Sequence, residues 1–161
     1  MKTLLAMRHA KSSWESDLND HDRPLNERGR ADAPSLGAAL QEHDLIPQLI
    51  LTSTAKRARR TAELVAENCS FDGEILLRPD FYEASLQDYL EGIRGVPPAI
   101  ATLLIVGHNP GMTELVEDLT GRPEALGTGN IAVITFEIEA WAELDGETDG
   151  RLVKVFRPRE L

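Results

Sequence analysis

The sequence predicts an α/β protein, a three-layer α/β/α sandwich around a mostly parallel central sheet. Three short apolar runs, each bounded by polar or turn residues, have the composition of strands covered on both faces; they are Leu4–Met7, Leu49–Leu51 and Leu103–Val106. Segments with the apolar spacing of helices separate these runs and follow the third one. Strands that alternate with helices in this way are typical of a parallel sheet with a helical layer on each side.

Four segments have the spacing expected of helices. Residues 86–93 and 112–119 carry apolar residues at i, i+3, i+4 and i+7, and residues 55–65 carry a thinner stripe of alanine and valine. Ser85 and Asp88 are spaced as a capping-box variant at the start of the first of these helices. Residues 26–43 are also predicted to be helical, with Pro34 expected to kink or divide the helix.

The C-terminal part predicts two further strands. Ile134, Phe136 and Ile138 alternate with polar residues, which is typical of a strand buried on one side only. The last strand is expected at residues 152–156, after a turn region at 145–150. The chain shows no internal repeat or linker, so we expect a single domain over its 161 residues, 1–161.

Composition excludes several classes of protein. Seventeen Lys and Arg against 27 Asp and Glu give a formal charge of −10, which argues against an extended grip on nucleic acid. The single cysteine, Cys69, cannot form an internal disulfide or a cysteine-rich zinc site. No apolar run approaches the length of a membrane span, and Arg8 ends the first one too early for a secretory signal. We therefore expect a cytoplasmic enzyme or binding domain without a membrane partner.

Polar residues that could carry chemistry follow the three apolar runs. Arg8 and His9 follow the first run, Ser53 follows the second, and Gly107 and His108 follow the third. Active sites in open α/β sheets lie at the carboxyl ends of the strands. A lone histidine after a strand is more often structural than catalytic, but two histidines that converge with arginines favour a catalytic site.

The segment after the second run has a spacing with mechanical consequences. Ser53, Arg57 and Thr61 are four residues apart, so a helix places them on one face, with Arg57 in its first turn. The unpaired N–H groups of a helix start favour anions. The alternative is a plain basic helix face, and we expect only Arg57 to turn inward while its basic neighbours stay in solvent; these are Lys56, Arg59 and Arg60.

Five motifs, in order along nearly the whole chain, resemble those of the histidine phosphatase superfamily, which is phosphoglycerate mutase-like, and of its small SixA-type phosphohistidine phosphatases. Residues 8–12 (RHAKS) resemble the Arg-His-Gly/Ala signature, residues 20–29 the Arg-Pro-Leu segment, and residues 53–61 the S-x-x-x-R-x-x-x-T pattern. Residues 82–85 (YEAS) fall where a catalytic acid usually stands, and residues 107–111 (GHNPG) resemble the second-histidine motif. The resemblance implies that family's fold without a large cap.

The resemblance also implies a role for each matching residue. His9 would be the nucleophile that forms a phosphohistidine intermediate, while Arg8, Arg57 and a protonated His108 would surround the phosphoryl oxygens. Positive charge from the two arginines would favour a neutral His9. Glu83 would protonate the leaving group, although a surface glutamate is the alternative interpretation. Other residues expected to bind phosphate or line its pocket are Lys11, Ser12, Arg23 and Asn109.

The short length narrows the substrate class. Only 24 residues separate Glu83 from His108, which leaves room for one helix and one strand but not for a lid. We therefore expect a shallow, open site that takes phosphohistidine on a protein, and one that inorganic phosphate or sulfate can occupy. The alternatives are a phosphatase for a small phosphorylated metabolite or nucleotide, and a non-catalytic phosphate-recognition domain.

No cofactor or metal is predicted for this chemistry. The run Asp20-His21-Asp22 has ligand-type side chains, but no second cluster of suitable ligands accompanies it in the sequence.

Overall fold

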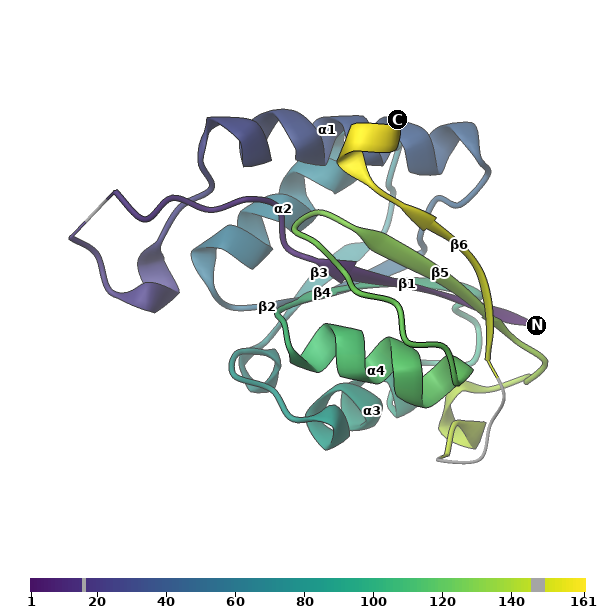
Figure 1. Ribbon diagram of the computed structural model, residues 1–161. Coiled ribbons are helices and arrows are strands. Elements are labelled where there is room, and N and C mark those ends of the chain that lie inside the picture. Colours follow the sequence, from purple (N-terminus) through teal and green to yellow (C-terminus); the bar gives the residue numbers. More distant parts are fainter. Residues whose placement is uncertain (16, 146–149) are drawn as a thin grey trace.

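The computed structural model describes residues 1–15, 17–145 and 150–161. All of its named strands belong to one six-stranded sheet with the order β3-β2-β4-β1-β5-β6 (Figure 1). In chain order the strands are β1 Lys2–Arg8, β2 Leu49–Ser53, β3 Glu74–Arg78, β4 Thr102–Gly107, β5 Ile131–Phe136 and β6 Arg151–Phe156. The first four strands run parallel to their neighbours among themselves, whereas β5 is antiparallel to β1 and β6. The mostly parallel α/β sheet that the sequence predicts is confirmed.

Helices cover both faces of this sheet (Figure 1). Helices α1 (Glu27–Glu42) and α2 (Lys56–Glu67) lie on one face, and α3 (Leu86–Arg94) and α4 (Gly111–Thr120) lie on the other. The described residues also form short 3-10 helices, which are η1 Asp20–Asp22, η2 Pro79–Phe81, η3 Trp141–Glu143 and η4 Pro158–Glu160. The predicted capping box of Ser85 and Asp88 is present at the start of α3.

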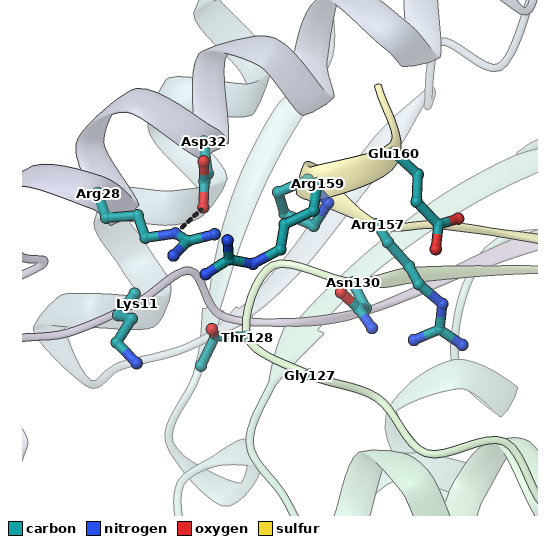
Figure 2. Close-up of a pocket in the computed structure, with 10 residues that line it drawn as sticks. Lys11, Arg28, Asp32, Gly127, Thr128, Asn130, Arg157, Arg159 and Glu160 are labelled. Atoms are coloured by element: carbon teal, nitrogen blue, oxygen red, sulfur yellow. Dashed lines mark ion pairs between the residues drawn. The ribbon is translucent and has the colours of Figure 1, made fainter.

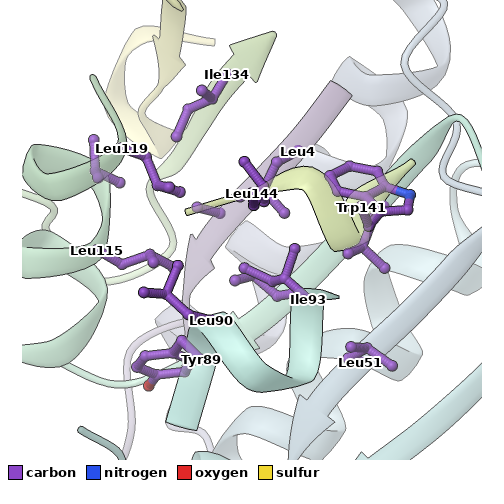
Figure 3. Packing of buried hydrophobic residues seen from close by; sticks show 14 of the residues in the cluster. Leu4, Leu51, Tyr89, Leu90, Ile93, Leu115, Leu119, Ile134, Trp141 and Leu144 are labelled. Atoms are coloured by element: carbon purple, nitrogen blue, oxygen red, sulfur yellow. The ribbon is translucent and has the colours of Figure 1, made fainter. Parts of the chain in front are cut away.

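Each helical layer packs on the sheet through its own hydrophobic cluster. Alternate residues of β1 serve the two clusters, since Leu4 and Ala6 face α3 and α4 while Leu5 and Met7 face α1 and α2. Figure 3 shows the first cluster, where the Trp141 ring closes the end of the layer and its Nε1 donates to the Ile100 carbonyl at 2.8 Å. Full burial of one large apolar side chain contributes about 1.5–3 kcal/mol to the stability of the folded protein. Burial of these two clusters therefore stabilises the packing of a helical layer on each face of the central strands.

Two predictions about elements are wrong. Strand β5 is buried on both faces, because it lies inside the sheet between β1 and β6 and contributes to both clusters. Ile138, expected in the same strand, lies beyond its end at Phe136. Of the two effects predicted for Pro34, a kink or a division of the helix, division does not occur, because α1 runs unbroken over Glu27–Glu42. Of the predicted turn region at 145–150, residues 146–149 lie outside the described residues.

Strand β3 is not among the strands predicted from the sequence. This strand pairs with β2 at the edge of the sheet, and most of its residues are exposed. It does contain a short apolar run, Ile75-Leu76-Leu77, which is as long as the run Leu49–Leu51 but is not among the three apolar runs predicted as strands. Among the described residues, no helix has the length and apolar character needed to cross a membrane.

The topology brings three strand ends to one edge of the sheet. Strand β4 lies between β1 and β2, and all three run in the same direction. Arg8 at the end of β1 pairs with Gly107 at the end of β4. Residues that follow these strands therefore meet at the carboxyl edge, where ligand sites of such sheets form.

Candidate active site

A cavity of about 370 Å³ opens at this carboxyl edge. Every residue predicted for the site except Glu83 lines it, and so do Trp14, Asp20 and Thr128. The strand ends therefore bring the predicted histidines and arginines together, as the sequence predicts.

His9 lies directly after β1 with its ring buried, 7% exposed. Its backbone N–H donates to the Gly107 carbonyl at 3.0 Å, and its Nδ1 lies 2.7 Å from the Ala10 carbonyl oxygen. Because a carbonyl oxygen only accepts hydrogen bonds, Nδ1 carries the proton and the neutral ring keeps a lone pair on Nε2. Burial, together with the smaller effects of His108, Arg57 and Arg8, lowers the pKa of His9 to about 3.

The ring of His108 stands 5.1 Å from that of His9, centroid to centroid. Its Nε2 is 2.8 Å from the Ser53 hydroxyl oxygen, and its Nδ1 is buried with no hydrogen-bond partner among the described residues. Burial, followed by the charge of Arg57, lowers the pKa of His108 to about 4. This pKa favours a neutral His108 in the site without an anion. The protonated form expected from the sequence refers to the site with a phosphoryl group bound.

Tyr89 on α3 fixes the backbone of His108. Its hydroxyl oxygen accepts the His108 N–H at 3.1 Å, and the fully buried ring lies against Gly107 and Gly111. A Cβ on Gly107 would lie 2.4 Å from the Tyr89 hydroxyl oxygen, and one on Gly111 would lie 2.8 Å from its ring. The two glycines of the second-histidine motif thus make room for the phenol. Sequence analysis placed Tyr89 only on the apolar face of its helix.

Thr61 links the His9 loop to helix α2. Its Oγ1 accepts the Ala10 N–H at 3.0 Å and donates to the Arg57 carbonyl at 2.7 Å. Arg57 is 6% exposed, whereas the other three basic residues of this helix start are exposed. The inward turn of Arg57 alone confirms what the four-residue spacing predicts.

Arg57 is held by a residue that sequence analysis did not assign to the site, Asp20 of η1. The Arg57 Nη2 donates to Asp20 Oδ2 at 3.0 Å and its Nη1 donates to the Asp20 carbonyl at 2.7 Å. Tyr82 donates to the same carboxylate at 2.6 Å and Arg23 at 3.1 Å. The Tyr82 hydroxyl, then the two guanidinium groups, hold the pKa of Asp20 well below its usual range. The one feature of the sequence that connects Asp20 with a predicted site residue is its position three residues before Arg23.

Two buried arginine nitrogens in this site lack partners. Within the described residues, neither Arg8 Nε nor Arg57 Nε makes a hydrogen bond, although Arg8 Nη1 donates to the Leu126 carbonyl at 3.2 Å. A buried donor without an acceptor costs about 1–3 kcal/mol. A phosphoryl group in the cavity would bring oxygen acceptors to both arginines, so the arrangement favours an oxyanion.

The remaining cavity residues frame the site. Arg23 donates to the Ser12 hydroxyl oxygen at 3.0 Å and lies 3.5 Å from the centre of the Trp14 ring, so it fixes the loop after β1. Asn109 uses both ends of its amide within the protein, on Leu126 and Thr113. Lys11 is exposed at the mouth.

Glu83 is the predicted residue that the structure leaves outside the cavity lining. Its side chain is exposed, and its backbone adopts the left-handed conformation (φ 55°), which side chains other than glycine rarely take. It follows Tyr82, whose ring centroid is 5.7 Å from that of His108. Glu83 thus stands beside the cavity.

The described residues contain no group of three or more His, Cys, Asp or Glu side chains that could hold a metal ion. The histidines and arginines around the cavity are instead suited to bind and transfer an anionic group.

Comparisons with known proteins agree with this arrangement. The model of the histidine phosphatase superfamily (branch 1) matches residues 4–95. An uncharacterized chloroplastic protein of Arabidopsis thaliana is 34% identical over 152 residues, which are 88% of this chain and 70% of that protein. A relative from Mycobacterium tuberculosis is 36% identical over 109 residues, and the match covers 68% of this chain and 66% of that protein, just under two thirds of its length.

Solved structures are similar over almost the whole chain. A candidate phosphohistidine phosphatase SixA from Nakamurella multipartitia superposes with a TM-score of 0.86 at 27% identity, over 98% of this chain and 96% of that one. The protein histidine phosphatase SixA complexed with tungstate shares the fold, with a TM-score of 0.84 at 21% identity over 98% of both chains. Because the family model spans more than half of the sequence, this chain belongs to branch 1 of the histidine phosphatase superfamily, and it is of the SixA type.

Proposed function

We propose that this chain is a metal-independent phosphatase that hydrolyses phosphohistidine on a protein, through a covalent intermediate on His9. Family membership and the SixA-type neighbours support phosphatase activity. The observation that carries the proposal is the pair of histidine rings 5.1 Å apart in a cavity where two arginine nitrogens lack acceptors.

In the first step, the lone pair of His9 Nε2 attacks phosphorus. The new N–P bond forms as the bond from phosphorus to the leaving atom breaks, and the leaving group takes up a proton. Charge on the transferring phosphoryl oxygens is stabilised by Arg8, Arg57 and His108. Water then attacks phosphorus, the bond to His9 breaks, and inorganic phosphate leaves.

Protonation of the leaving group is the step that depends on substrate. A departing imidazole is a good leaving group and needs little help, whereas the alkoxide of a phosphate ester needs an acid. Glu83 is proposed for this role; it is exposed and follows Tyr82, whose ring centroid is 5.7 Å from that of His108. A modest contribution from Glu83 fits a phosphohistidine substrate.

The site's surroundings support a protein substrate. Helix α3 and strand β4 take up most of the described segment between Glu83 and His108, so this segment holds no inserted lid. Trp14, with 78% of its surface exposed, stands at the mouth. An open site of this kind admits a side chain on a protein surface, whereas a small metabolite would lack enclosing contacts.

The test compares substrates and variants. Wild-type protein is assayed on a phosphohistidine-bearing carrier protein, a panel of sugar and nucleotide phosphates, and an aryl phosphate. We expect the highest kcat/KM on phosphohistidine, and loss of all activity in His9→Ala but not in His43→Ala, a change at an exposed histidine. A higher kcat/KM on a small metabolite would contradict the substrate class. Aryl phosphate turnover that persists in His9→Ala would contradict the mechanism.

A further inference from the structure

A second cavity of about 280 Å³ adjoins the candidate active site, between the start of α1, the 127–130 turn and the C-terminal η4 (Figure 2). Its charged lining consists of four cations and two carboxylates, namely Lys11, Arg28, Arg157, Arg159, Asp32 and Glu160. We call it the basic cavity. Such an excess of positive charge is unusual in a chain whose formal charge is −10.

Two of these cations are not neutralised by the protein. Asp32 pairs with Arg28 at 3.5 Å, and Glu124 pairs with Arg157. In the part of the chain that the structure describes, Lys11 and Arg159 have no ion-pair partner. Arg28 and Arg159 extend into the cavity from different elements (Figure 2), so an anion between them would reduce the repulsion of two like charges.

The basic cavity adjoins the catalytic one. Lys11 and Thr128 line both cavities. The turn that carries Thr128 is tied to the nucleophile, because the Gly129 N–H donates to the His9 carbonyl at 2.9 Å. A negative group that is attached near the reacting phosphoryl can therefore enter the basic cavity at the same time.

A third cavity, of about 700 Å³, extends the same surface past Lys11 to Arg28 and Trp14. The Trp14 ring rests on the Arg23 guanidinium, 3.5 Å from its centre, and is nevertheless 78% exposed. Each cavity alone has the size of a small-molecule site, so a small substrate fills one of them. Only an extended partner contacts all three, and tryptophan and arginine are the residues that most often anchor protein partners.

We propose that Lys11, Arg28 and Arg159, together with Trp14, form a docking surface for an acidic face of the phosphorylated protein, beside its phosphohistidine. This inference rests on the proposed function and adds to it the charge of the partner. Charge complementarity decides for an acidic protein face, because Lys11 and Arg159 have no ion-pair partner among the described residues and line the basic cavity together with Arg28.

Binding is the primary test. Two fluorescently labelled peptides carry the same stable phosphohistidine analogue, one flanked by Asp and Glu and the other by Asn and Gln. We expect wild-type protein to bind the acidic peptide about tenfold more tightly in anisotropy titrations at low salt, and the difference to shrink as salt is added. The double variant Arg28→Glu/Arg159→Glu is expected to bind both peptides alike.

A matched control separates docking from net charge. Arg94→Glu/Arg122→Glu makes the same charge change at exposed residues on α3 and after α4, which cover the opposite face of the sheet. It is expected to keep the preference for the acidic peptide. Aryl phosphate hydrolysis is expected to be unchanged in both double variants, since neither Arg28 nor Arg159 lines the catalytic cavity.

Three results would overturn the docking surface. The first is equal binding of the two peptides by wild-type protein, and the second is that the control variant loses the preference for the acidic peptide as fully as Arg28→Glu/Arg159→Glu does. The third is that a small bisphosphate such as fructose 1,6-bisphosphate binds wild-type protein more tightly than the acidic peptide does, and that this binding is lost in Arg28→Glu/Arg159→Glu. The last result would assign the cavity to a second phosphate of a small molecule. Absence of phosphohistidine turnover would instead contradict the proposed function, and the binding preference would still be measured.

Discussion

The two histidines of the site depend on their neighbours for their charge. Burial lowers the pKa of His9 to about 3 and that of His108 to about 4, and the arginine charges act in the same direction. A neutral His9 suits a nucleophile, whereas a neutral His108 donates less strongly to phosphate. A bound oxyanion adds negative charge next to both rings, which favours protonation of His108.

Histidine NMR tests this coupling. At about pH 6 we expect both rings to be neutral in the anion-free protein, because both pKa values lie below the ordinary value for histidine. Saturation with tungstate is expected to protonate His108, while His9 keeps its proton on Nδ1. The ¹⁵N shifts of the two imidazole rings report the outcome. A His108 that is already protonated without an anion would contradict this description.

Arg57 is predicted to be the cation on which turnover depends most. Replacement by Ala is expected to lower kcat by roughly 10²–10³, the loss typical of one preorganised electrostatic donor. Asp20→Asn leaves the guanidinium in place and removes only its carboxylate partner, so a smaller loss is expected.

The control for Arg57→Ala is Arg60→Ala, a change at an exposed residue of the same helix. Steady-state kinetics on an aryl phosphate measures all three variants. Near wild-type turnover in Arg57→Ala would refute the assigned role.

The sequence predicts best those site residues whose side chains carry the reactive or anion-binding groups. The position of two histidines after strand ends, together with the spacing of Ser53, Arg57 and Thr61, predicts four of the residues that line the cavity: Arg8, His9, Arg57 and His108. Asp20 and Tyr89 were missed for a physical reason. Each acts through a bond that exists only after folding, across 37 residues for Asp20 and Arg57 and 19 residues for Tyr89 and His108. No local pattern encodes such a contact.

At the scale of elements, the loop after β1 and helix α2 are joined through one side chain. Thr61 is fully buried, and its hydroxyl bonds to both the Ala10 N–H and the Arg57 carbonyl. The position of the loop that carries His9 relative to Arg57 therefore depends on this hydroxyl.

Thr61→Val keeps the shape of the side chain and removes the hydroxyl. The Ala10 N–H would be left unsatisfied, so we expect a loss of stability of about 1–3 kcal/mol together with a lower kcat. Thr120→Val removes a similar hydroxyl bond, to the Val116 carbonyl on α4, and is expected to leave kcat unchanged. Urea denaturation and aryl phosphate kinetics measure both variants. Equal kcat values for the two variants would show that Thr61 has no special role.

The strands and helices that contribute most to the buried core were the ones predicted from the sequence. The central strands and the amphipathic helices follow from the apolar pattern. Edge strand β3 carries a short apolar run too, Ile75-Leu76-Leu77, but most of the strand is exposed and the prediction passed over it. The error at β5 arose from weighing Ile134, Phe136 and Ile138 without the adjoining run Ile131-Ala132-Val133, whose residues are buried on both sides. Which strands are interior depends on sheet order, and local periodicity does not specify that order.

For the molecule as a whole, the site joins segments that are distant in sequence. It draws on β1, η1, α2 and the loop between β4 and α4, so an anion in the cavity contacts groups that are assembled only in the folded state. A ligand that binds only the folded protein stabilises it, by about 2.7 kcal/mol at one hundred times its Kd.

Thermal unfolding tests this linkage. Tungstate or phosphate is expected to raise Tm in wild-type protein and to have little effect on Arg57→Ala, which lacks one of the anion's cationic partners. A chelator such as EDTA is expected to change neither Tm nor aryl phosphate turnover. Loss of activity with EDTA that a divalent metal restores would contradict the metal-independent proposal.

The most direct test of the account is to trap the intermediate. Wild-type protein is mixed with a phosphohistidine-bearing protein, quenched rapidly under alkaline conditions, digested, and analysed by mass spectrometry for an acid-labile phosphate. The account predicts phosphate on Nε2 of His9, present in the wild type and absent in His9→Ala. Phosphate found on another residue instead, or turnover that persists in His9→Ala, would contradict it.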